Sequence, residues 1–379
     1  MKTNLLFVLF IASFLSCNTI QHDESSISIS EGYCEIPLTK CADSVWVKGV
    51  KSSFPLSEIT SGKLFDDNCF FMDSKSRILY YMRSDSIVSM LNSFGRGHGE
   101  YESITSYAYN EDEQCVYVYD SGKSQLLKYS VPDFSFISSS TFELRIIAME
   151  YYNQKLLAVC SNNLGKKSFH GIYEISLNNG SYKLLRKMLF METHFIEEAS
   201  FFRDDESLYL VIPGYDNTIC RYDGNSLETI SKFFYGSRNL ESKIFTVDEN
   251  KAEDYSEALL TLMTGEYSVG GYYSSMRDSS FLSFWHATKE NEKLLFLITT
   301  VFNGSSNSYS LMLPDLSIPI VPCCNYNGLY ISIIENNVPE LTDNEYKSLS
   351  VLEKTIIDSL KKQSYDNPVL VYYKLKEEP

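Results

Sequence analysis

The residues able to do acid–base or metal chemistry are few and scattered along this chain. No two histidines share a metal-ligand spacing such as His-Glu-x-x-His. Neither a Gly-x-Ser-x-Gly nucleophile elbow nor an EF-hand loop occurs. The five histidines are His22, His98, His170, His194 and His286. Single residues from distant segments can still meet in a folded protein, so spacing alone assigns no catalytic residue, and the sequence predicts neither a bound metal nor a cofactor.

Three short polar segments resemble ligand-binding loops at first sight. The glycine cluster Gly95-Arg96-Gly97-His98-Gly99 lacks the Gly-Lys-Ser/Thr end of a P-loop and precedes no long helix, which favours a turn. Glu100, which follows it, is expected to cap nearby backbone amides. The acidic runs 111–113 and 204–206 each precede a predicted strand. Solvated turns are the favoured interpretation of both runs, with a calcium site as the alternative.

The cysteines give no sign of a zinc or redox centre, because no Cys-x-x-Cys pair occurs. Apart from Cys17, the chain has eight cysteines, an even number that permits disulfides outside the cytoplasm: Cys34, Cys41, Cys69, Cys115, Cys160, Cys220, Cys323 and Cys324. Cys115, Cys160 and Cys220 lie in apolar, strand-like runs and are expected to be buried as small hydrophobic residues.

Composition narrows the class of protein. The 33 basic and 49 acidic residues give a net charge of −16, which argues against a nucleic-acid partner. The chain also has 28 Tyr and 23 Phe, residues that favour β-sheets. Most of these aromatics are expected to fill the packing between sheets. An exposed glycan-stacking platform, for which Trp46 and Trp285 are the only indoles, is the alternative.

A unit of two apolar strands joined by a polar turn recurs along the body of the chain. Most steps between units are near the roughly 40–45 residues of a propeller blade, and two longer steps are interpreted as insertions. The marks taken as equivalent are Tyr80, Tyr117, Leu157, Tyr209, Phe296 and Tyr330. Six units over residues 32–379 predict an all-β, six-bladed β-propeller, which leaves few exposed strand edges.

Two segments depart from the strand pattern. Residues 248–263 and 342–362 carry apolar residues at helical spacing, and Thr342 with Glu345 has the spacing of a capping box. In the second segment one stripe would hold Tyr346, Leu349, Leu352, Ile356 and Leu360. Both segments are predicted to be short helical insertions that pack against the body of the protein.

The N-terminus carries the features of an export signal. The mainly apolar run 5–15 is too short to span a bilayer core of about 30 Å, so residues 1–16 are predicted to be a signal peptide. Phe14-Leu15-Ser16-Cys17 resembles the lipobox of bacterial lipoproteins, with Phe14 where leucine is usual. This resemblance implies acylation at Cys17, and the polar residues 17–31 are predicted to form a flexible tether. Ordinary secretion is the alternative.

Both ends of the body resemble one family. Phe94 to Tyr101 is similar to the Gly-x-Gly-Pro-Gly-Glu-Tyr/Phe element of the six-bladed β-propeller lipoproteins of Bacteroides-type bacteria, relatives of NHL-repeat propellers, with His98 in place of proline. Residues 35–38 and 366–376 resemble the start and end of the same family. The resemblance implies an outer-membrane lipoprotein, periplasmic or surface-exposed, and it supplies no catalytic residues. We also expect a strand within 33–48 to pair with 369–375 and close the ring.

Together these features favour a module that binds or scaffolds an unknown protein, peptide or glycan and is held to the membrane by its N-terminal lipid. The alternative is an envelope enzyme, a glycan- or peptide-directed lyase or hydrolase with its site in the central channel. Histidine or acidic side chains from three or more blades meeting on the axis would favour the enzyme.

Overall fold

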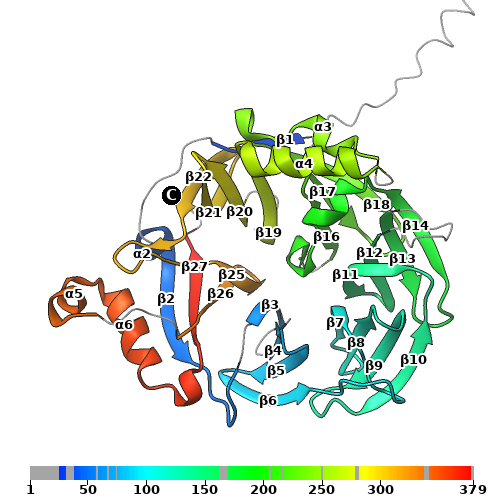
Figure 1. The fold of residues 1–379 in the computed structure, drawn as a ribbon, viewed down its shortest axis with the longest axis horizontal. Helices are drawn as coiled ribbons and strands as arrows, with labels where there is room; N and C mark the ends of the chain where they lie inside the picture. The colour runs from blue at the N-terminus through cyan, green and yellow to red at the C-terminus, as the bar shows by residue number, and fades with distance from the viewer. Residues whose placement is uncertain are drawn as a thin grey trace, which may run out of the picture.

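The computed structural model is a ring of six sheets around a common axis (Figure 1). Each sheet has four antiparallel strands, and one of them carries a fifth, parallel strand. The structure describes residues 25–30, 38–56, 59–65, 68–73, 75–161, 170–204, 206–214, 217–248, 251–277, 281–336 and 341–376. The predicted six-bladed β-propeller is therefore confirmed. The predicted signal peptide, Cys17, His22 and Cys34 lie outside the described residues.

The first three blades are simple meanders that run outward from the axis. The first contains β3 (Ile59–Phe65), β4 (Asn68–Asp73), β5 (Ile78–Arg83) and β6 (Ser86–Leu91). The second contains β7 (Ile104–Asn110), β8 (Cys115–Asp120), β9 (Gln125–Ser130) and β10 (Phe136–Thr141). The third contains β11 (Arg145–Tyr152), β12 (Lys155–Ser161), β13 (Gly171–Ser176) and β14 (Tyr182–Lys187).

The fourth and fifth blades repeat this pattern. The fourth contains β15 (Phe201–Arg203), β16 (Leu208–Ile212), β17 (Thr218–Tyr222) and β18 (Leu227–Phe234). The fifth contains β19 (Tyr267–Arg277), β20 (Phe281–Glu290), β21 (Lys293–Phe302) and β22 (Ser305–Ser310). A two-stranded hairpin, β23 (Met312–Leu313) and β24 (Ile318–Pro319), leads from the fifth blade to the sixth.

The sixth blade joins the two ends of the chain. Its inner strands are β25 (Pro322–Tyr326), β26 (Leu329–Ile334) and β27 (Val369–Leu375), and its outermost strand is β2 (Ala42–Gly49), which follows the short helix α2 (Leu38–Cys41). In the ladder between β2 and β27, Val45 lies opposite Tyr373 and Val47 opposite Val371. This pairing confirms the predicted closure of the ring.

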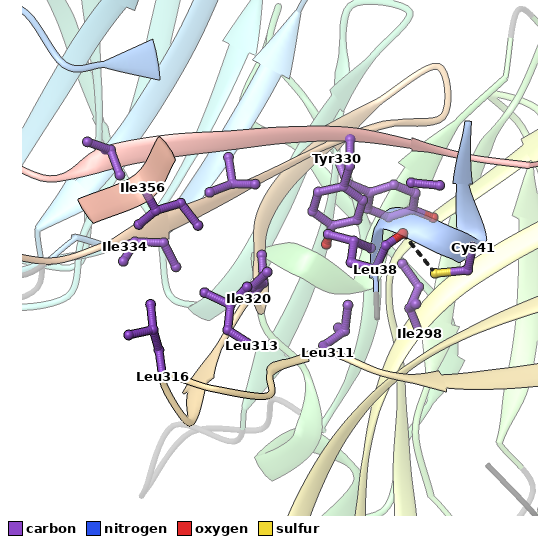
Figure 2. Packing of buried hydrophobic residues seen from close by; sticks show 14 of the residues in the cluster. Leu38, Cys41, Ile298, Leu311, Leu313, Leu316, Ile320, Tyr330, Ile334 and Ile356 are labelled. Atoms are coloured by element: carbon purple, nitrogen blue, oxygen red, sulfur yellow. Dashed lines mark hydrogen bonds between the residues drawn. The ribbon is translucent and has the colours of Figure 1, made fainter. Parts of the chain in front are cut away.

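Apolar side chains fill each of the six seams between neighbouring blades. Rings of Phe70, Tyr107 and Tyr109 pack between the first and second blades. At the seam between the fifth and sixth blades, Ile298 and Leu311 meet Tyr330 (Figure 2). Aromatic residues thus mainly serve inter-blade packing, and the two indoles also stack on the protein's own rings, Trp46 on Tyr372 and Trp285 on Phe296.

The repeat marks taken from the sequence are not all equivalent. Tyr117, Leu157, Tyr209 and Tyr330 lie in second strands, whereas Tyr80 in β5 and Phe296 in β21 lie in third strands. Second and third strands are both rich in apolar residues, so the sequence pattern does not separate them. The number of blades is unaffected by this correction.

The helices that the structure describes lie in connections between strands. The predicted helix near 248–263 is α4 (Ala252–Thr264), preceded by α3 (Ser242–Phe245). Short 3-10 turns are η1 (Met191–Phe195), η2 (Glu198–Ser200), η3 (Gly236–Arg238) and η4 (Ser364–Asp366). Of the helices that the structure describes, none is long and apolar enough to cross a membrane.

The segment 342–362 is two helices, not the single helix that the apolar stripe predicted. α5 (Asp343–Ser348) begins at the predicted capping box of Thr342, and α6 (Val351–Leu360) begins at a second box in which Ser350 accepts a hydrogen bond from the backbone N–H of Glu353. Leu349 is extended between them. Because a serine side chain at this position satisfies free N–H groups, it starts a new helix. Ile356 and Leu360 pack in the core, as expected.

The segment predicted as a flexible tether is ordered in part. β1 (Ser25–Ser28) pairs parallel with β18 and extends the fourth blade to five strands. Ile29 is buried against Phe233 and Phe284, between the fourth and fifth blades. The prediction of a tether over 17–31 therefore does not hold for these residues.

The seven described cysteines are free and buried. Burial raises the pKa of Cys115, Cys160 and Cys220, which makes them poor nucleophiles and confirms their role as small hydrophobic residues. Cys69 of the first blade and Cys324 of the sixth lie with their sulfur atoms 3.7 Å apart.

The closure of the ring predicts the effect of Trp46→Ala. Trp46 on β2 stacks on Tyr372 of β27 at 5.4 Å between ring centroids, so its loss should lower the free energy of unfolding by about 2 kcal/mol. The control is Ile137→Ala on the exposed outer strand β10, which should change it by less than about 0.5 kcal/mol. If urea denaturation showed the same loss of unfolding free energy for both variants, the β2–β27 pair would have no special role in stability.

Candidate binding site in the central channel

A cavity of about 240 Å³ lies on the axis of the ring, at the face where innermost strands turn into second strands. Its walls come from the innermost strands β3, β15, β19 and β25 and from turns that follow innermost strands. Phe65 is the last residue of β3, whereas Glu111 follows β7, Asp204 follows β15 and Asn327 follows β25. The site therefore collects side chains from most of the ring.

Lys63 forms the centre of the cavity floor. Its ammonium group lies 2.8 Å from the Glu150 carboxylate and 2.6 Å from the Glu198 carboxylate, and it donates to the carbonyl oxygens of Tyr107 and Met149 at 2.7 Å. The three charged side chains are only 7%, 6% and 8% exposed. Although burial alone would lower the pKa of Lys63, the two carboxylates raise it, so the lysine is charged.

The two carboxylates differ in their environments. Burial alone would raise the pKa of Glu150, but the charges of Lys63 and Arg203 hold it below its usual value. Burial raises the pKa of Glu198, and the neighbouring lysine offsets this only in part. An ammonium group has three N–H bonds. Four oxygens surround the ammonium group of Lys63, one more than it has N–H bonds. The Glu198 oxygen nearest to the ammonium group therefore receives no hydrogen bond.

Arg203 carries the charge network from the floor to the wall of the cavity. Its Nη2 donates to Glu150 at 2.5 Å and to the carbonyl of Tyr151 at 2.7 Å. The guanidinium group also lies over the Phe65 ring, 5.4 Å from its centroid. Two cations and two carboxylates thus compensate one another across the axis. They come from the first, third and fourth blades and from the segment before the fourth blade.

Glu198 reaches the axis on the connection between the third and fourth blades. This connection contains η1 and η2, and η2 lies against β3, β11 and β19. The hydroxyl of Tyr272 donates to the carbonyl of Phe195 and fixes the segment to the fifth blade. Ser106 and the backbone N–H of Tyr107 donate to the second oxygen of Glu198. The connection therefore places Glu198 and Ala199 in the lining of the cavity.

No sequence pattern pointed to the four residues of the charge network, Lys63, Glu150, Glu198 and Arg203. Their partners are separated by tens of residues or more, so no motif spacing links them. A weak signal exists in the strands themselves: Lys63 precedes Leu64-Phe65, and Glu150 follows Ile-Ile-Ala-Met. A charged residue inside an otherwise apolar strand is buried only when it is paired.

The histidines do not meet on the axis in the part of the chain that the structure describes. His98 lies in a turn against Phe136, and His170 and His194 both lie against Phe190. His286 is buried on β20, where burial lowers its pKa to about 3 and keeps the ring neutral. Within the described ranges, no group of three His, Cys, Asp or Glu residues has a geometry that could hold a metal ion.

The polar segments singled out in the sequence are turns. Gly95–Gly99 joins the first blade to the second, and the Glu100 carboxylate accepts a hydrogen bond from the backbone N–H of Gly97 at 2.6 Å, as predicted. Glu111–Glu113 lies between β7 and β8. Asp204 accepts hydrogen bonds from the backbone N–H groups of Glu206 and Ser207 in the turn after β15. Two of the acidic residues, Glu111 and Asp204, also line the cavity.

The fold and the site define a six-bladed β-propeller with a cavity on its axis and a charge-compensated floor. Residues 51–374 match the model of a family described as a domain of unknown function, DUF4934, and the chain belongs to that family. No curated protein sequence matches the chain.

Two solved structures share the fold. A candidate exported protein from Bacteroides fragilis is 14% identical with a TM-score of 0.69, over 93% of this chain and 100% of that one. A member of the DUF4221 family from Bacteroides vulgatus is 9% identical with a TM-score of 0.51, over 88% of this chain and 97% of that one. At these identities the likeness shows the fold alone.

The charge network predicts a pH-dependent loss of stability in Lys63→Met. At pH 7 the variant leaves Glu150 and Glu198 buried without their lysine, which should cost about 3–5 kcal/mol. The loss should shrink at pH 5, because a carboxyl whose pKa is raised in the folded state is stabilised by protonation as the pH falls. Urea denaturation at both pH values measures the difference.

The matched control is Lys128→Met. Lys128 pairs with Glu113 at the surface, so its loss should cost no more than about 1 kcal/mol. A Lys63→Met variant as stable as this control, or one equally destabilised at both pH values, would contradict the described network.

Proposed function

We propose that this protein is a lipid-anchored envelope protein whose propeller binds a protein, peptide or glycan through a polar group that enters the axial cavity. The observation that carries the proposal is the open cavity above a floor of fully paired charges. Such a floor offers a polar surface without a net charge. Ligand sites are typically concave, with a few fixed polar groups that provide specificity.

The arrangement favours binding over catalysis. Acidic side chains from three blades do line the cavity, Glu111, Glu150 and Asp204, which meets the condition stated above for an enzyme. Glu150 and Glu198, however, are buried and tied to Lys63. General acid–base catalysis needs a titratable group within hydrogen-bond reach of the substrate. Glu198 meets one requirement, since burial raises its pKa. An envelope enzyme, a glycan- or peptide-directed lyase or hydrolase with Glu198 as its acid, is therefore the second candidate.

The anchor is proposed from the N-terminal sequence. The apolar run 5–15 ends at Ser16-Cys17, in the arrangement of a lipobox. Acylation of Cys17 would hold the protein to the outer membrane, on its periplasmic or its outer side. The structural likeness to a candidate exported protein and the family resemblance to propeller lipoproteins, with their kinship to NHL-repeat proteins, support this assignment.

Acylation predicts the result of metabolic labelling in a Gram-negative host. The wild-type chain should incorporate a labelled fatty acid and fractionate with membranes, whereas Cys17→Ala should lose the label. Cys34→Ala serves as the control and should be labelled as the wild type is. Undiminished labelling of Cys17→Ala would exclude the proposed anchor.

The cavity predicts where a ligand binds. In a panel of short peptides and oligosaccharides, compounds that raise the melting temperature of the wild type should lose at least about tenfold in affinity for Glu111→Trp, which narrows the cavity mouth. Glu113→Trp, on the same turn but paired with Lys128 outside the cavity, should bind as the wild type does.

The same panel separates the two candidate functions. Unchanged affinity in Glu111→Trp would place the binding site elsewhere on the propeller. Turnover of a bound compound that is lost in Glu198→Gln would favour the enzyme over the binding module.

A further inference from the structure

We propose that the face of the propeller that carries α4 rests on the surface of a zwitterionic lipid bilayer, so that the axial cavity points away from the membrane. The inference rests on the proposed acylation of Cys17. It adds an interaction surface and an orientation that the anchor alone does not provide.

An apolar surface lies around the C-terminal half of α4. This α4 surface consists of Leu259, Leu260, Met263 and Leu294, which are 38%, 59%, 74% and 50% exposed. The opposite side of the helix, with Ala258 and Leu262, packs against the body of the protein. The exposed residues are therefore not needed to hold the helix in place.

Leu294 belongs to this surface although it comes from a different element. It lies opposite Lys289 in the ladder between β20 and β21. The ammonium group of Lys289 donates to the backbone carbonyls of Leu262 and Met263 at the end of α4. The start of β21 thus lies beside the last turn of the helix, and its leucine extends the apolar surface.

The α4 surface and the axial cavity lie on opposite faces of the disc. The cavity is built at the ends of the innermost strands, where these turn into second strands. The segment containing α4 instead connects the outermost strand β18 of the fourth blade to the innermost strand β19 of the fifth. In an antiparallel meander such a connection starts and ends at the other face. Figure 1 shows α4 lying across the fourth and fifth blades on one side of the ring.

The N-terminal segment ties the anchor to this part of the disc. Ser25 to Ser28 pair with β18, and Ser28 lies opposite Phe234, the last residue of β18, whose side chain is also exposed. Seven residues separate Cys17 from Ser25, a length that spans at most about 30 Å. Because β1 runs parallel to β18, the chain reaches Ser25 from the cavity side of the blade and runs on toward α4. The length of the segment before Ser25 still lets an acylated Cys17 keep the fourth blade, and the α4 surface at its end, within reach of the bilayer.

Charge selects the kind of lipid. The N-terminal half of α4 carries Glu253, Asp254 and Glu257, and the whole chain has a net charge of −16. Anionic headgroups would repel this region. Contact through apolar side chains beside an acyl anchor needs no basic patch, so a zwitterionic surface fits best.

The experiment uses the full acylated chain in phosphatidylcholine vesicles that contain lipid with brominated acyl chains, which quench tryptophan at short range. Leu260→Trp should be quenched beyond the native level set by Trp46 and Trp285, and the extra quenching should fall when phosphatidylglycerol is added. Ile137→Trp is the matched control, because Ile137 is 50% exposed on the outer strand of the second blade, across the ring from the fifth. It should show no extra quenching.

The outcomes separate the surface from the anchor. If the protein floats with the vesicles but Leu260→Trp is not quenched, or both variants are quenched equally, the α4 surface does not contact the bilayer and the anchor stands. If neither the wild type nor Leu260→Trp floats, both proposals fail. A shift of Leu260→Trp emission with protein concentration in detergent, without vesicles, would show that a second copy covers this surface and would overturn the membrane contact.

Discussion

The pairing of β2 with β27 is the constraint on which the rest of the structure depends. A ladder between residues 42–49 and 369–375 joins the N-terminal part of the chain to the last blade and closes the ring of six sheets. With the ring closed, each blade is covered on both faces by its neighbours, and the abundant tyrosines and phenylalanines become inter-blade packing. The axial site exists because closure brings β3 and β25 beside each other.

At the axis the protein places charge where apolar packing would be simpler. Burying ions is costly, and an apolar replacement of a buried ion pair is often as stable. The Lys63 cluster gives the cavity a polar floor, whereas apolar side chains in its place would give an apolar one. Its partners come from separate blades, so the network also fixes how the first, third and fourth blades approach the axis. This arrangement suits a site that must keep its shape while a ligand enters.

The sequence predicted the fold better than it predicted the site. Repeated strand pairs and the similarity of both chain ends to one family specify a closed propeller, because local patterns repeat with every blade. The sequence did not separate second from third strands at Tyr80 and Phe296, because both kinds of strand are apolar. It also missed the break at Ser350, where the helical apolar stripe continues across a new capping box. Lys63, Glu150, Glu198 and Arg203 meet only through the tertiary fold, so no local pattern announces them.

The position of the closing strand sets the order of events in folding. β2 is made early, but its partner β27 lies at the end of the chain. During synthesis or export, β2 must wait without a ladder until nearly every other residue has emerged, and contacts between such distant residues form slowly. The sixth blade is therefore completed last. A chain cut short near its C-terminus would contain five whole blades and an unpaired β2, a species with an open edge and a tendency to aggregate.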